Sequence, residues 1–121
     1  MYCVHLISAF LQANFCGYRE YCVRPGSRMA YTQAESNAEH WYGVIGVYEK
    51  WNETLLLLAT VYPKYFQGAG QLASRIQLNE TEMIPIPRSV RLALETKLAD
   101  DMSLYKFARS KFEQQLQKYG I

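Results

Sequence analysis

The sequence predicts an α/β fold that is mostly helical, with one short buried strand at residues 42–47. Residues 41–47 form an aromatic and β-branched run that small glycines interrupt. Such a run fits a strand buried on both faces, because a strand with one wet face alternates apolar with polar residues. A helical pattern precedes the run, and a second apolar helical run that contains residues 55–59 follows it. Helix, strand and helix in this order form the unit of a layered α/β domain.

One strand does not make a sheet, so the 42–47 segment needs neighbouring strands. The rest of the chain does not obviously supply them. A two-sided apolar strand without neighbours exposes its backbone ladder and both apolar faces, which invites association. We therefore expect the isolated chain to be poorly soluble or to form homo-oligomers.

Length and composition limit the classes of protein to consider. The chain has 121 residues, the size of one small domain, and 50% of them are hydrophobic, which excludes a disordered chain. The formal charge of +2 is too slight to argue for nucleic acid as a partner. No apolar run approaches the ~20 residues that span a bilayer. Residues 1–11 lack the basic start and the cleavage site of a signal peptide, so a secretory signal would have to lie outside this chain.

The three cysteines, Cys3, Cys16 and Cys22, allow several interpretations. Cys16 and Cys22 enclose five residues, a spacing that closes a small loop, and a disulfide there would imply an oxidising compartment. Two unrelated free thiols are the alternative, since free cysteines are common buried residues. A zinc site needs four converging ligands, and only His5 and His40 could join the cysteines, at no recognisable spacing. If Cys16 and Cys22 pair, Cys3 either pairs outside this chain or is a free thiol.

The first long helix is predicted from a cap and a face of small residues. Ser27 is a candidate N-cap for the helix that follows it. Ala30, Ala34 and Ala38 recur every four residues and form a narrow face that would let the helix lie close to a sheet. His40 ends this helix, and a lone histidine at such a place is more often packed or solvated than catalytic.

Two N-glycosylation sequons begin at Asn52 and Asn79. Either sequence can arise by chance. Together with a disulfide they favour the secretory route.

The second helix is stopped by Pro63, and residues 71–84 are predicted to form an irregular loop. Pro85 and Pro87 precede a long helical tail, with Ser89 as its expected cap. Within the tail, apolar residues recur every four positions and predict a core-facing stripe: Leu104, Ala108, Phe112 and Leu116.

The usual catalytic motifs are missing from the sequence. The glycines at 68–70 lack the lysine and the preceding strand of a phosphate-binding loop. No nucleophile elbow and no zinc-protease motif occurs. Asp100 and Asp101 are most simply a solvated face that marks a break between a short helix and a longer one.

Four runs in a fixed order carry a family resemblance. The chain contains F-C-G-x4-C, then G-S-R-x-A, then V-I-G-V-x-E, and then P-K-Y-F-Q-G-A after a leucine-rich helix. The series resembles the C-terminal half of the uronyl (heparan or dermatan) 2-O-sulfotransferases and covers residues 11–117. The resemblance implies that residues 1–121 are the C-terminal portion of a single domain with a P-loop-like sulfotransferase fold. It also implies a Cys16–Cys22 disulfide and a partner for Cys3 upstream of Met1.

The resemblance also implies a function and a cellular location. Such proteins are Golgi membrane enzymes whose catalytic domain faces the lumen, and their membrane anchor would lie in the missing N-terminal part. They use 3′-phosphoadenosine 5′-phosphosulfate as donor and no metal. They transfer a sulfuryl group to the 2-hydroxyl of a uronic acid in a glycosaminoglycan such as heparan sulfate. These properties are what the resemblance implies for this chain.

The resemblance places few site residues within this chain. Sulfuryl transfer needs cationic groups and a base, and in the family the donor-phosphate loop and the catalytic histidine precede the matched region. The loop at residues 71–87 would cover the nucleotide. There, Thr81 would inherit a nucleotide contact, and Arg75 is the only side chain left to meet an anion. Because the donor-phosphate loop and the catalytic histidine are absent from this chain, we expect the chain alone to be catalytically silent. The 71–87 loop also departs from the basic family pattern by carrying Glu80 and Glu82, which would repel both sulfate and uronate.

A second hypothesis belongs to another class of protein. The chain would be a small secreted interaction domain held by a disulfide, without catalysis. A coding sequence upstream of Met1 that holds a donor-binding strand, loop and helix would favour the enzyme. A signal peptide there would favour the interaction domain.

Overall fold

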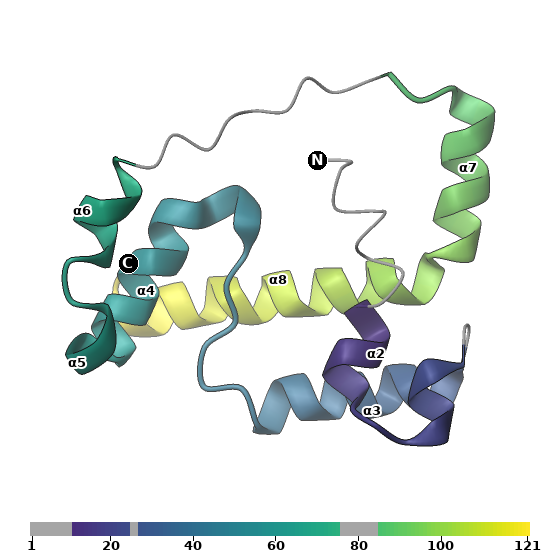
Figure 1. Cartoon of the computed structure of the whole chain (residues 1–121), viewed down its shortest axis with the longest axis horizontal. Helices are drawn as coiled ribbons and strands as arrows, with labels where there is room; N and C mark the ends of the chain where they lie inside the picture. The colour runs from purple at the N-terminus through teal and green to yellow at the C-terminus, as the bar shows by residue number, and fades with distance from the viewer. Residues whose placement is uncertain (1–10, 25–26, 76–84) are drawn as a thin grey trace. The chain divides into compact units, whose positions relative to one another are not determined.

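The computed structural model describes residues 11–24, 27–75 and 85–121. In this part of the chain every regular element is a helix, and none is a strand (Figure 1). The chain divides into two compact units. Unit 1 comprises Met1–Tyr42 and Glu82–Phe107, and unit 2 comprises Gly43–Thr81 and Ala108–Ile121. We describe each unit by itself.

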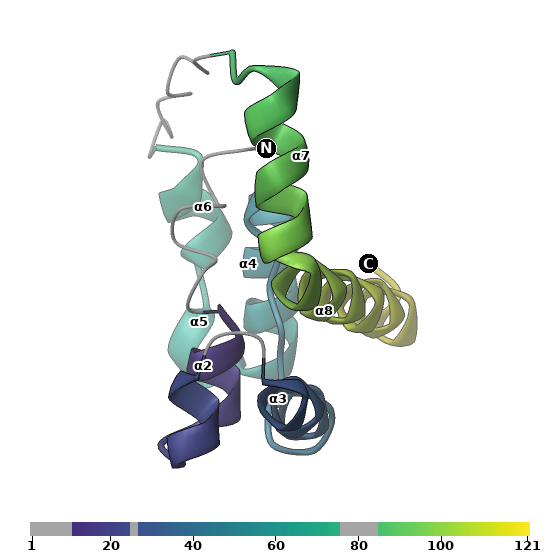
Figure 2. The same cartoon turned by 90° about the vertical axis from the view of Figure 1, so that its right-hand side faces the viewer.

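Unit 1 contains two helices that lie side by side, α2 (Leu11–Cys16) and α3 (Arg28–His40), as Figure 2 shows. A short 3-10 helix, η1 (Glu20–Val23), lies between them in the sequence and contacts both. Unit 1 also includes α7 (Arg88–Lys97) and the first half of α8 (Ala99–Tyr119).

The predicted start and small-residue face of α3 are confirmed. The Ser27 hydroxyl accepts a hydrogen bond from the Ala30 N–H at 3.2 Å, which satisfies one of the free donors of the first turn. Ala30, Ala34 and Ala38 are all buried. The expectation that this face packs on a sheet is wrong, because α3 packs against helix α2. Small side chains permit close approach of two helix backbones as well as of a helix and a sheet.

The core of unit 1 joins residues that are distant in the sequence. Cys16 and Cys22 pack with Ala30, Ala34 and Leu104, and half-buried aromatic residues surround them. Two further bonds tie α2 to α3, since the Asn37 side-chain amide donates to the C=O of Phe15 at 2.9 Å and of Cys16 at 3.1 Å. These carbonyls lie at the end of α2, where no intrahelical donor is available to them.

Unit 2 begins with residues 43–47 and continues as a series of short helices. These are η2 (Tyr48–Lys50), α4 (Trp51–Val61), α5 (Pro63–Phe66) and α6 (Ala69–Ala73). Pro63 ends α4, as predicted, and starts α5 at its first position, where a missing N–H has no cost. Gly68 separates α5 from α6 with φ of +83°, a left-handed conformation that glycine adopts without strain.

The predicted strand at 42–47 is wrong in this structure. The segment has no partner strand among the described residues, and it is buried on one face: Ile45 and Val47 are buried, whereas Gly46 is exposed. Polar side chains replace the missing ladder. The Gln115 side chain accepts from the Ile45 N–H at 3.2 Å and donates to the Gly43 C=O at 3.0 Å.

The glycines of this segment are explained by close contacts instead of two-sided burial. A Cβ on Gly46 would collide with the side chain of Thr54, which is buried and hydrogen-bonded to the backbone. A Cβ on Gly43 would collide with the hydroxyl of Tyr62, the outer end of a half-exposed ring. Gly46 is therefore the more restrictive position.

The C-terminal part contains two helices, as predicted, and they separate at Leu98 rather than at Asp100 and Asp101. Ser89 lies inside the first turn of α7, whose N-cap is Pro87, so the predicted serine cap is wrong. The stripe is confirmed for Leu104, Phe112 and Leu116, which are buried, and Ala108 is half-buried.

The prediction of an irregular loop at 71–84 is wrong at its start. Residues 71–73 belong to α6, because the left-handed Gly68 begins a new helical turn. Residues 76–84 lie outside the described residues. None of the described helices is long and apolar enough to cross a membrane.

Candidate functional site

The Cys16–Cys22 disulfide predicted by the family resemblance is confirmed, with the two sulfurs 2.03 Å apart and the two Cα atoms 5.5 Å apart. Gly17, directly after Cys16, has φ of +112°, which lets the chain turn at once out of α2 into the loop. Both half-cystines are buried in the core of unit 1. The disulfide therefore ties the end of α2 to η1.

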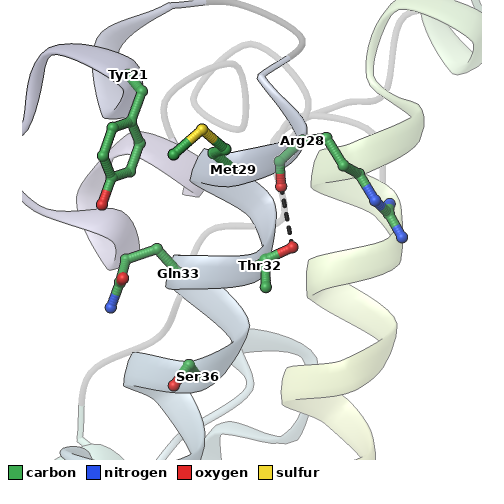
Figure 3. Close-up of a pocket in the computed structure, with 6 residues that line it drawn as sticks. All are labelled: Tyr21, Arg28, Met29, Thr32, Gln33 and Ser36. Carbon is green, nitrogen blue, oxygen red and sulfur yellow. Dashed lines mark hydrogen bonds between the residues drawn. The ribbon is translucent and has the colours of Figure 1, made fainter.

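An open hollow of about 410 Å³ lies beside this disulfide loop (Figure 3). Six residues of η1 and α3 line it: Tyr21, Arg28, Met29, Thr32, Gln33 and Ser36. Two of its polar side chains are already hydrogen-bonded within the protein. The Thr32 hydroxyl donates to the Arg28 C=O, and the Gln33 amide donates to the Asn37 side chain. The hollow offers an aromatic ring and polar side chains, but no nucleophile with an adjacent base.

Arg28 does not direct its charge into this hollow. In Figure 3 its side chain points away from Tyr21 and Gln33. The guanidinium lies over the Tyr31 ring, 4.7 Å from the centroid, and 3.8 Å from a carboxylate oxygen of Asp100. Burial, and secondarily the nearby Glu35 carboxylate, raises the pKa of the Tyr31 hydroxyl above its ordinary value.

Asp101 is buried, which contradicts the predicted solvated face. Its residue exposure is only 8%, and its carboxylate accepts a hydrogen bond from the Gln12 backbone N–H at 3.0 Å. Desolvation raises the pKa of this carboxyl, against the opposing effect of the Gln12 hydrogen bond, and Asp100 raises it further. Gln12 is itself buried and donates through its side chain to the Ser27 C=O at 3.1 Å. This group of polar residues connects α2, α8 and the start of α3.

A second hollow lies along α7 and carries two arginines. Ile86, Arg88, Arg91, Leu92 and Glu95 line it. Arg91 forms an ion pair with Glu95, whose carboxylate oxygen lies 3.1 Å from the Arg91 Nε. This surface therefore offers less net positive charge than its arginines suggest.

The structure describes one of the two residues predicted to contact the donor. Arg75 follows α6, is exposed, and has no ion-pair partner among the described residues. Thr81 lies outside the described residues. The two are therefore not brought together by the structure, and their roles stay predictions.

Of the other predicted residues, some are described by the structure and some lie outside the described residues. Asn52 is exposed in the first turn of α4, whereas Asn79 lies outside the described residues, as do Cys3 and His5. Glycosylation at either sequon stays a prediction. His40 is exposed, and its Nδ1 lies 2.8 Å from the Ser36 C=O. Because a carbonyl only accepts, Nδ1 carries the proton in this contact.

No cluster of three or more potential metal ligands occurs among residues 11–24, 27–75 and 85–121. The functional groups that the sequence analysis missed are instead polar residues on apolar faces. Asp101 lies three positions before Leu104 on the apolar stripe of α8, and Gln115 lies three positions after Phe112. A polar residue in register with such a stripe is the signal that would have identified each of them.

No protein-family model matches the chain. It is 28% identical over 105 residues to heparan sulfate 2-O-sulfotransferase 1 of Mus musculus, which covers 82% of this chain and 30% of that protein. It is 38% identical to the Xenopus laevis protein of the same name, over 58 residues that cover 48% of this chain and 16% of the relative.

A fly protein gives the same result. The chain is 29% identical over 105 residues to the uronyl 2-sulfotransferase homolog pip of Drosophila melanogaster, which covers 80% of this chain and 20% of the relative. The chain is thus a distant homologue of the heparan sulfate and uronyl 2-O-sulfotransferases, as its motifs predict. It spans about 30% or less of the length of these relatives.

Proposed function

We propose that this chain is the C-terminal portion of a carbohydrate sulfotransferase domain. The complete enzyme would move a sulfuryl group from 3′-phosphoadenosine 5′-phosphosulfate to the 2-hydroxyl of a uronic acid in a glycosaminoglycan. The observation that carries the proposal is the 105-residue match to proteins named for this reaction, which covers 82% of the chain for the mouse relative. The buried Cys16–Cys22 disulfide, which the motif series implies, supports it.

The chain would supply structure and one cationic contact to the reaction. Transfer of a charged group needs positive charge around the donor and a base on the attacking hydroxyl. Arg75 is exposed with no ion-pair partner among the described residues, so it is available to a donor phosphate or sulfate. Thr81 would contact the nucleotide. His40 is a poor base, because its Nδ1 proton is directed to Ser36 and it lies on an exposed helix end.

The base and the remaining phosphate ligands would then come from the portion of the relatives that this chain does not match. A disulfide and two sequons suit the lumen of the Golgi, where the complete enzyme would be anchored in the membrane. Asn52 is exposed, as glycosylation requires.

The first test is an assay of the chain with donor and a desulfated uronic acid polymer. We expect no turnover by these 121 residues alone. Turnover by the isolated chain would overturn the assignment of the chemistry to another part of the enzyme.

The second test asks whether Arg75 meets the donor. Residues of this chain would replace the matched part of the mouse enzyme, and Arg75→Ala would be compared with Arg19→Ala, an exposed arginine of the disulfide loop. Loss of a hydrogen bond to a charged group predicts a rise in donor KM of roughly tenfold or more for Arg75→Ala, and almost none for Arg19→Ala. Equal KM values in both variants would remove Arg75 from the proposed site.

A further inference from the structure

The side-chain amide of Gln33, which lines the hollow beside the disulfide loop, is held in one orientation. The Asn37 side chain donates to the C=O groups of Phe15 and Cys16, so its nitrogen faces them and its oxygen faces away. That oxygen, which can only accept, lies 2.8 Å from Nε2 of Gln33. The hydrogen-bond network therefore fixes which end of the Gln33 amide is the nitrogen.

The fixed amide keeps hydrogen-bonding capacity. It has two N–H groups and one C=O, and only one N–H group has a partner among the described residues. The Ser36 hydroxyl also has no partner in this part of the chain. Met29, Thr32, Gln33 and Ser36 share one face of α3, because they are spaced by three and four positions. The hollow thus offers a donor and acceptors in fixed places, which lowers the entropic cost of binding a ligand.

The aromatic ring of the hollow is anchored by the disulfide loop. Tyr21 directly precedes the half-cystine Cys22 and packs against the buried core of unit 1. In Figure 3 its ring, the Met29 side chain and the Gln33 amide lie on one side of α3, whereas Arg28 points to the other side. None of the six lining residues therefore directs a charge into the hollow.

These groups fit an uncharged ring that has an apolar face and polar groups at its edge. The negative face of an aromatic ring attracts the slightly positive C–H groups of a sugar ring. A phosphate, sulfate or carboxylate would lack the cationic partner that anion sites provide. An amide with a free donor and a free acceptor pairs well with a second amide, and N-acetylhexosamines carry one as their acetamide group. The volume of about 410 Å³ lies within the range of roughly 300–1,000 Å³ for small-molecule sites.

We propose that the hollow binds one N-acetylhexosamine unit of a glycan. The sugar ring would lie against Tyr21, and its acetamide would bond to Gln33 with the acetamide methyl against Met29. The Ser36 hydroxyl would bond to a ring hydroxyl. This site holds a sugar and transfers no group, so the inference goes beyond the function proposed above and does not depend on sulfuryl transfer.

Saturation-transfer NMR on the whole, oxidised chain measures such binding and needs little protein. The probe is the methyl β-glycoside of N-acetylglucosamine, and methyl β-glucoside, which lacks the acetamide, is the comparison sugar. We expect a Kd on the order of 1 mM for the probe, with the strongest transfer to its acetamide methyl and ring C–H groups. The comparison sugar should bind at least about fivefold more weakly, because it cannot bond to the Gln33 amide.

Gln33→Met keeps the length of the side chain and removes its amide. It should weaken probe binding about tenfold and leave the comparison sugar within about twofold, since that sugar uses only the ring and the hydroxyl. Gln117→Met makes the same replacement at an exposed position of α8 and is the matched control, with affinity unchanged within about twofold.

Two Tyr21 variants test the ring separately. Tyr21→Phe keeps the aromatic face and the packing, so both sugars should bind as they do to the parent chain. Tyr21→Leu removes the aromatic face and should weaken both sugars alike, by about fivefold or more.

Two longer probes distinguish the sources of the sugar. An unsulfated heparosan oligosaccharide alternates N-acetylglucosamine with uronic acid, whereas N,N′-diacetylchitobiose is the core of N-linked glycans. The probe that binds more tightly would identify the source. The proposal would be overturned by the absence of transfer to the methyl glycoside, by equal affinities for the two simple sugars, or by equal effects of Gln33→Met and Gln117→Met. A failed assay of sulfuryl transfer would leave these binding results unaffected.

Discussion

In unit 1 helices cover one another, whereas in unit 2 side chains complete the backbone of an extended segment. Ala30 and Ala34 let α3 approach α2, and the Cys16–Cys22 disulfide fastens the resulting core. Unit 2 has no disulfide among its described residues, and its residues 43–47 depend on Thr54 and Gln115. The comparison teaches that similar small-residue patterns serve two purposes. In unit 1 they let two helices close a core, and in unit 2 Gly46 leaves room for the Thr54 side chain beside the backbone.

Removing the disulfide should have the largest effect and should be confined to unit 1. We expect Cys16→Ser with Cys22→Ser to lower the free energy of unfolding by about 2–4 kcal/mol, because the cross-link restricts the unfolded chain and both sulfurs are buried. Urea unfolding measures this change. A reductant should lower the parent chain to the level of the variant and leave the variant unchanged. A variant as stable as the parent would show that the helix contacts alone hold unit 1.

Thr54→Val should lower the free energy of unfolding of unit 2 by slightly less than the loss of the disulfide lowers that of unit 1. The valine keeps the shape of the buried side chain but leaves the Val47 N–H and C=O without the threonine hydroxyl. The Val47 C=O keeps the Lys50 N–H as a donor, whereas the Val47 N–H is left unsatisfied, and this predicts a loss of about 2 kcal/mol.

Thr60→Val is the control for this variant, because the Thr60 hydroxyl is exposed and bonds only to the Leu56 C=O of its own helix. It should change stability by less than about 0.5 kcal/mol. Equal losses in the two variants would mean that Thr54 does not support the segment.

Asp101→Asn should have the smallest effect and should appear as a change in pH dependence. Because burial raises the pKa of Asp101 above its ordinary value of 3.8, the folded protein keeps this proton at pH values where the unfolded chain has lost it. This contribution to stability is therefore largest below pH 3.8 and decreases as the pH rises through the raised pKa. Asparagine keeps an acceptor for the Gln12 N–H and cannot ionise.

Urea unfolding between about pH 3 and pH 7 would compare the parent with Asp101→Asn, and the variant should lose less stability as the pH rises. Asp100→Asn is the comparison variant, because it removes a partially exposed partner of Arg28 and only the smallest of the causes that raise the pKa of Asp101, so it should weaken the pH dependence less than Asp101→Asn does. Parallel pH profiles for the parent and Asp101→Asn would contradict the buried, proton-retaining carboxyl.

The sequence predicted the local features that depend on neighbouring residues. The Ser27 cap, the alanine face of α3, the stop at Pro63 and the stripe of α8 were all predicted from patterns within a few turns. The family motifs predicted the disulfide and the relationship to the 2-O-sulfotransferases.

The predictions that were wrong concern features that depend on contacts between residues distant in the sequence. A run such as 42–47 satisfies the rule for a buried strand, but the hydrogen bonds at Gly43 and Ile45 come from Gln115, which is 70 positions from Ile45 and which no local pattern indicates. The sequence around Asp101 and Asp100 predicts a solvated pair, because it contains no sign that the Gln12 N–H will lie beside Asp101. The candidate donor contact at Arg75 and Thr81 comes from resemblance alone, because local patterns contain no information about a ligand.

Amide hydrogen exchange of the isolated, oxidised chain tests most directly whether the side chains of Gln115 and Thr54 hold residues 43–47. We expect slow exchange at Ile45 and Val47, whose N–H groups donate to Gln115 and Thr54, and fast exchange at Val44 and Gly46, whose N–H groups have no acceptor among the described residues. Uniformly fast exchange across the four amides, or slow exchange at Val44 and Gly46, would contradict it.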